Sequence, residues 1–146
     1  MENNSSTKIL YGTVVFIILG TIVSLFYFSF LMPLHVDEGS YWFHFTNKTW
    51  YNRFDPIIAL PHHTLTIYMA KWSLLIFGYN GIGFRFPVIL FGVLSLWLIY
   101  SFAKNNLSSG SVAALSAAFL ALCPIFVHYS HELRGYPSLL FFALCS

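Results

Sequence analysis

Long uncharged apolar runs alternate with short polar segments along the chain, and this pattern predicts an all-α membrane protein. The first run covers residues 9–32, contains no charged side chain and ends at Met32-Pro33. A helix needs about 20 largely apolar residues to cross the hydrocarbon core, so this run predicts a first span. It is too long for the apolar core of a signal peptide, and no cleavage site of small residues closes it. We therefore interpret it as a retained span.

Two later runs predict further spans at residues 82–103 and 112–130, and another begins at 137–146. The polar turn between the second and third spans is short, so these two helices are expected to form an antiparallel hairpin. Half a span at 137–146 has no stable end in lipid. The chain is therefore expected to be the front piece of a longer protein, with residues 1–146 forming the amino-terminal part of one transmembrane domain.

The apolar segment 64–77 allows two interpretations. It is short, contains Lys71 and is rich in aromatic residues. Apolar stretches of about 10–14 residues more often lie at the interface than cross the bilayer, and this composition suits a helix in the headgroup layer. We favour the interfacial helix, which leaves residues 33–81 as one external loop. The alternative is a crossing helix, which would place the later loops on the opposite side.

The composition supports a lipid environment. Of the 146 residues, 58% are hydrophobic and 8% are charged, whereas soluble domains carry about 25% charged residues. This excludes an ordinary cytosolic enzyme. The formal net charge of +2 is too small for a protein that binds nucleic acid through its phosphates. Cys123 and Cys145 lie in apolar runs, which argues against a disulfide framework or a metal knuckle.

Because charged residues are scarce, their positions carry information. They gather in residues 34–63 and again in residues 128–136, and polar groups at the membrane boundary are functional candidates by default. Asp37 and Glu38 follow the first predicted span closely. Two adjacent carboxylates can serve as general base and metal ligand. The alternative is that Asp37 caps a short helix that starts at Glu38.

The other candidates also have structural alternatives. His62 and His63 can bind a divalent metal ion, or can simply begin a helix after Pro61. Arg85 at a helix entrance can lie beside an anionic headgroup, or can snorkel to the interface. Glu132 and Arg134 are two residues apart and would not face each other on a helix. In an extended turn both can reach a shared polar cavity, and the alternative is an interfacial salt bridge that contributes little.

Several motifs then line up in order: the segment from His35 to Trp42 after the first span, the segment from Leu60 to Leu65, Phe77-Gly78, Arg85-Phe86-Pro87 at the start of a span, and the segment from Pro124 to Tyr136. In order and placement they resemble the amino-terminal part of the family-39-type membrane glycosyltransferases. That group includes protein mannosyltransferases, aminoarabinose transferases of lipid A and Rgt-like sugar transferases. The resemblance covers the whole chain, although a full member is several times longer.

The resemblance implies a polytopic helix bundle of the GT-C type, with juxtamembrane helices in the first external loop. It implies an enzyme that transfers a sugar from a polyisoprenyl-phosphate donor to an extracytoplasmic acceptor, with inversion at the anomeric carbon. Asp37 would be the general base with Glu38 beside it, and His62 and His63 would lie near a divalent metal ion and the donor phosphate. The substrate-binding candidates are Arg85, Glu132, Arg134 and Tyr136.

A shared site also fixes the expected topology. The polar stretches around Asp37 and Glu132 can meet only if an even number of crossings separates them, so the segment 64–77 must not cross. The amino terminus is then cytoplasmic and the active-site loop external, in a multi-pass protein of the plasma membrane. The rival interpretation is a small non-catalytic membrane subunit. A transporter would place ionisable groups inside its spans, and the complete spans hold none in their central turns. We expect the fragment alone to be inactive.

Overall fold

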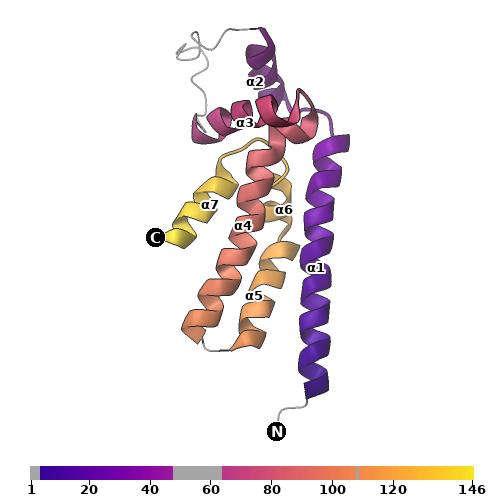
Figure 1. Ribbon diagram of the computed structural model, residues 1–146, viewed down its shortest axis with the longest axis vertical. Coiled ribbons are helices and arrows are strands. Elements are labelled where there is room, and N and C mark those ends of the chain that lie inside the picture. The colour runs from indigo at the N-terminus through magenta and orange to yellow at the C-terminus, as the bar shows by residue number, and fades with distance from the viewer. Residues whose placement is uncertain (1–3, 48–63, 108) are drawn as a thin grey trace.

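The computed structural model describes residues 4–47, 64–107 and 109–146, and within these ranges the chain is helical, without a strand. The helices are α1 (Asn4–Leu31), α2 (Val36–Asn47), α3 (Thr64–Phe77), α4 (Gly81–Leu107), α5 (Gly110–Leu122), α6 (Pro124–Tyr129) and α7 (Tyr136–Cys145). Figure 1 shows α1, α4 and α5 running alongside one another, with α2 and α3 gathered at one end. The predicted all-α fold is confirmed for the described residues.

Within the described residues, two helices are long and apolar enough to cross a membrane, Thr7–Leu31 and Gly81–Leu107. They correspond to the spans predicted at 9–32 and 82–103. The first begins two residues earlier and ends one residue earlier than predicted, and the second begins one residue earlier and ends four residues later. The second continues through Pro87, which lies in its early turns. The outer face of α1 presents large apolar side chains to the surroundings over most of its length, including Phe16, Leu19, Val23, Phe26 and Phe30. A surface of this kind is expected to face lipid rather than water.

The third predicted span differs from the prediction, because α5 ends at Leu122 and α6 begins at Pro124. Cys123 between them is extended, as the residue before a proline prefers, and proline occupies the first turn of α6. The break leaves carbonyl groups at the end of α5 without partners inside the helix. The Thr21 hydroxyl of α1 is shared between the Ile17 carbonyl of its own helix, at 3.0 Å, and one of these carbonyls, that of Ala121, at 3.2 Å.

In Figure 1, α3 lies across the ends of the long helices rather than alongside them. Its inner face packs Ala70 and Leu74 against Phe84 and Val88 near the start of α4, and its outer face exposes apolar side chains such as Trp72. This is the orientation expected of an interfacial helix.

The turn from α3 into α4 is tight and depends on glycine. Gly78 has a φ of 81°, which favours glycine and ends α3 in the usual way. Asn80 then caps α4, because its Oδ1 accepts a hydrogen bond from the Gly83 amide at 2.7 Å. A Cβ atom at Gly83 would lie 2.6 Å from the Gly78 carbonyl oxygen. The local sequence therefore sets the sharp change of direction that brings the start of α4 beneath α2.

The described part of the first polar segment, residues 34–47, and the second polar segment come to the same end of the bundle. The start of α2, the start of α4 and the turn between α6 and α7 all lie there, whereas the α4–α5 connection lies at the opposite end (Figure 1). Close packing holds the α6–α7 turn against α4: a Cβ atom at Gly92 would lie 2.9 Å from the hydroxyl oxygen of Ser130. The fold thus delivers residues far apart in the sequence to one small region.

Candidate functional site

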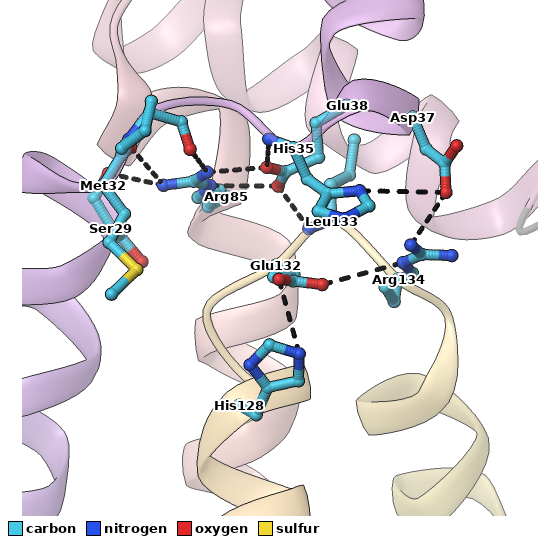
Figure 2. A network of polar contacts seen from close by, with 11 residues as sticks. Ser29, Met32, His35, Asp37, Glu38, Arg85, His128, Glu132, Leu133 and Arg134 are labelled. Atoms are coloured by element: carbon cyan, nitrogen blue, oxygen red, sulfur yellow. Dashed lines mark hydrogen bonds and ion pairs between the residues drawn. The ribbon is translucent and has the colours of Figure 1, made fainter.

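The buried carboxylate of Glu38 joins three segments of the chain (Figure 2). Its Oε1 accepts hydrogen bonds from Arg85 Nε at 2.9 Å and from the Leu133 amide at 2.6 Å. Its Oε2 accepts from Arg85 Nη2 at 2.6 Å and from the His35 amide at 2.9 Å. Glu38 is 1% exposed. Because both oxygens are fully engaged, this carboxylate holds the structure together and is not placed to take a proton from a substrate.

Arg85 uses all five of its N–H groups inside the protein. Its Nε and Nη2 groups donate to the Glu38 carboxylate, and Nη2 also donates to the Pro33 carbonyl. Its Nη1 group donates to the carbonyls of Ser29 and Met32. These carbonyls belong to the last turn of α1 and the residues just after it, where a helix leaves acceptors without partners and favours a cation. Arg85 therefore caps α1 while it pairs with Glu38.

These positions differ from those predicted for Glu38 and Arg85. Both were expected in the aqueous site, Glu38 beside the catalytic base and Arg85 on the substrate. Instead they form a buried ion pair, and no N–H of Arg85 is left for a substrate. Burial raises the pKa of Glu38, but the hydrogen bonds from Arg85, Leu133 and His35 outweigh it and hold the pKa below its ordinary value. Glu38 therefore stays ionised.

The start of α2 is stabilised by Glu38, and not by the Asp37 cap considered as an alternative. The His35 amide donates to the Glu38 carboxylate three residues on, while the Gly39 amide donates to the His35 carbonyl. A side chain that reaches back in this way is one half of a capping box. Asp37 lies in the same first turn but points in a different direction (Figure 2).

Asp37 faces the opposite way from Glu38 and is 45% exposed. Its Oδ2 lies 2.7 Å from Arg134 Nη2. The hydrogen bond from the Leu133 amide to Glu38 sets this geometry. Asp37 precedes Glu38 and Arg134 follows Leu133, so the two side chains are brought face to face. The predicted meeting of the Asp37 and Glu132 stretches is thus confirmed.

The contacts continue from Arg134 along a row of alternating charges. Arg134 Nε lies 3.7 Å from Glu132 Oε2, and the other oxygen of Glu132 lies 3.4 Å from His128 Nε2. At the other end, His35 Nδ1 lies 3.9 Å from Asp37. Glu132 and Arg134 can reach each other because residues 130–133 form a turn. Of the helix and the turn considered for these two residues, the structure shows the turn. His128 has no role in the sequence-based prediction, although its spacing of four residues from Glu132 was a usable signal.

The aromatic residues near the row differ in their exposure. The Tyr136 ring, a substrate-binding candidate, is 46% exposed and lies 4.5 Å from the Tyr129 ring, centroid to centroid. Tyr41, one turn along α2 from Asp37, is buried. Burial, and then the negative charge of Asp37, raise the pKa of Tyr41, so its phenol remains protonated.

His62 and His63 lie outside the residues that the structure describes, so their role in metal binding stays a prediction. Among the described residues, no group of three or more His, Cys, Asp or Glu side chains is arranged to hold a metal ion.

Comparison with known proteins adds one match. The profile of the dolichyl-phosphate-mannose-protein mannosyltransferase family matches residues 62–145, which is more than half of the chain. No curated protein and no solved structure matches the chain. The match begins after Asp37, but it includes Arg85, Leu133 and Arg134, which contact the Asp37-Glu38 pair. The resemblance drawn from the order of the motifs is confirmed: the chain belongs to the dolichyl-phosphate-mannose-protein mannosyltransferase family.

Proposed function

We propose that this chain supplies the catalytic end of a membrane glycosyltransferase that takes a sugar from a polyprenyl-phosphate donor and passes it to an extracytoplasmic acceptor. Family membership and the two long apolar helices support a glycosyltransferase in a membrane. The observation that carries the finer proposal is the half-exposed Asp37 carboxylate, held 2.7 Å from Arg134 at the polar end of the bundle.

In the proposed reaction, Asp37 accepts the proton of the acceptor hydroxyl. The oxygen attacks the anomeric carbon as the bond to the donor phosphate breaks, so the configuration inverts and polyprenyl phosphate leaves. A half-exposed carboxylate can meet an acceptor from water, unlike the buried Glu38. General base catalysis of this kind contributes about 10²–10⁴-fold to a rate.

The enzyme works in a membrane because the donor's tail is insoluble in water. The donor phosphate would then lie at the bilayer surface. We place that surface near α3, which lies across the ends of the long helices (Figure 1). Arg134 and Tyr136 are the substrate-binding candidates that remain partly open to solvent, and a guanidinium can bind a phosphate through two hydrogen bonds.

The donor class is tested with the full-length protein reconstituted in lipid vesicles. Radiolabelled mannose is supplied either on polyprenyl phosphate or on a nucleotide, together with an acceptor extract. We expect label to move from the polyprenyl donor alone. Transfer from the nucleotide sugar would contradict the proposed donor. A full-length protein that transfers sugar from neither donor would favour the non-catalytic membrane subunit.

The orientation is tested by cysteine labelling in intact cells. Cys123 and Cys145 are replaced by alanine, and single cysteines are introduced by His35→Cys or Lys104→Cys, both at exposed positions. If the catalytic end is external, a membrane-impermeant maleimide labels position 35 in intact cells and position 104 only after lysis. The reverse pattern would place Asp37 in the cytoplasm and exclude an extracytoplasmic acceptor.

A further inference from the structure

Arg134 lies between two carboxylates and binds them unequally. Its Nη2 is 2.7 Å from Asp37, whereas its Nε is 3.7 Å from Glu132, beyond hydrogen-bonding distance. The Nε atom is buried and has no hydrogen-bond partner among the described residues. A buried N–H without a partner is unfavourable, so a small movement of Glu132 toward Arg134 would be stabilising.

Glu132 is held back from that movement by its contact on the other side. Its second carboxylate oxygen lies 3.4 Å from Nε2 of His128, one helical turn earlier. Figure 2 shows the Glu132 side chain between His128 and Arg134. Both distances are long for an ion pair with a hydrogen bond, and a tilt that shortens one lengthens the other. The charge on His128 therefore decides which neighbour the Glu132 carboxylate approaches.

The His128 side chain is open to solvent, since it is 55% exposed, while that of Glu132 is 11% exposed. Histidine is the side chain whose charge ordinarily changes between pH 5 and 8. The titratable groups around it are few. On the same segment, the rings of Tyr129 and His131 lie 5.1 and 5.6 Å away, centroid to centroid.

The neighbouring elements add three further titratable or charged groups. From α7, Tyr136 contacts Tyr129, and from the α2 segment, Asp37 and His35 are linked to the row through Arg134. From α1, Phe28 packs against His131. Tyrosines do not ionise near neutral pH, and His131 is buried and donates its Nδ1–H to the Val127 carbonyl at 2.8 Å. Two histidines of the row are therefore exposed, His35 beside Asp37 and His128 beside Glu132. The His128–Glu132 pair is the one that reaches Asp37 through Arg134.

We propose that His128 is a positioning residue that controls, through Glu132 and Arg134, how strongly Asp37 attracts a proton; this rests on the proposed function in taking Asp37 as the base. When His128 is neutral, Glu132 closes on Arg134 Nε, and Arg134 is shared between two carboxylates. When His128 takes a proton from water, Glu132 turns toward it. Arg134 then pairs with Asp37 alone, and Asp37 becomes a weaker base.

The test measures sugar transfer by the full-length protein in vesicles between pH 5.5 and 8.5. Each His128 variant is compared with its parent on a His35→Asn background, which removes the other exposed histidine of the row. In the wild type we expect the turnover rate to rise through the histidine range by about two- to fivefold, the ratio that corresponds to one partly exposed ion pair. His128→Gln should remove this rise and hold the rate at the high-pH level. His128→Lys carries a permanent positive charge and should hold the rate at the low-pH level. The Michaelis constant for the donor should change little.

His131→Gln is the matched control, because it removes a neighbouring histidine that does not face Glu132. Its profile, scaled to its own maximum, should keep the rise. A His128→Gln profile that superimposes on the wild type, or His128→Gln and His128→Lys proteins with the same rate at all pH values, would overturn the inference and leave the proposed function intact. A wild-type protein that transfers no sugar would overturn both.

Discussion

Replacement of Asp37 by asparagine is expected to lower the rate of sugar transfer by about 10²–10⁴-fold, the contribution of a general base. Asparagine keeps the size of the side chain but cannot accept the proton. Because Asp37 is half exposed and Glu38 holds the start of α2, the fold should tolerate the change. Turnover in vesicles and the thermal unfolding midpoint, measured on the same Asp37→Asn preparation of the full-length protein, check both parts of the expectation.

Two further variants make this result specific. Asp37→Glu restores a carboxylate at a different reach, so it should recover part of the lost rate. His35→Asn removes the other side chain that flanks Asp37, at a similar exposure and 3.9 Å away, and should change the rate by less than the Asp37 variants. Transfer by Asp37→Asn at the wild-type rate would exclude Asp37 as the base.

The second large effect is expected on stability. Arg85→Met should destabilise the protein by about 3–5 kcal/mol, since it leaves the Glu38 carboxylate buried and unpaired. It also removes the donors to the carbonyls at the end of α1. Activity should fall as well, because the Glu38 contact to Leu133 keeps Arg134 facing Asp37. Thermal or denaturant unfolding in lipid discs measures the loss.

A double-mutant cycle separates the pair from its parts. Adding Glu38→Gln to Arg85→Met removes the stranded charge, so the double variant should lose less stability than the two single losses added together. Lys104→Met is the matched control: it removes a cation from the exposed far end of the same helix and should change stability by about 0.5 kcal/mol or less. Equal losses for Arg85→Met and Lys104→Met would contradict the buried pair.

The same pair predicts the direction of the pH dependence. Glu38 has a lowered pKa in the folded protein, so its stabilising contribution is present above the ordinary glutamate value and is lost as the pH falls through the lowered value. The wild type should therefore lose this part of its stability in acid. Glu38→Gln, which cannot be protonated, should be less stable near neutral pH and less sensitive to acidification.

Apolar runs were sufficient to predict the long helices, because the length of an uncharged run is a property of the sequence alone. Thus α1 and α4 begin and end within a few residues of the predicted spans. The division of 112–130 into α5 and α6 was missed although Pro124 was visible, since hydropathy does not register a break. The short length and the lysine of 64–77 sufficed to favour a helix that does not run alongside the spans.

The sequence identified most residues of the candidate site but not how they are arranged. Scarcity of charge drew attention to Asp37, Glu38, Arg85, Glu132 and Arg134, and the structure brings all five into one network. The sequence could not show that Glu38 and Arg85 form a buried pair while Asp37 and Arg134 form a partly exposed one. That division depends on backbone groups, namely the Leu133 amide and the carbonyls at the end of α1. Every residue carries such a carbonyl, so the sequence does not indicate which backbone groups become partners in the fold.

The hydrogen bond between Thr21 and the Ala121 carbonyl has a consequence for the end of the bundle that carries Asp37. It ties the middle of α1 to the point where α5 stops, while Arg85 ties the end of α1 to α4. Polar backbone at membrane depth is tolerated when a neighbouring side chain satisfies it. Sliding α1 by a single residue, about 1.5 Å, would break both ties at once. The position of Asp37 relative to α4 and α5 is therefore linked to a contact in the middle of the bundle, far from the polar end.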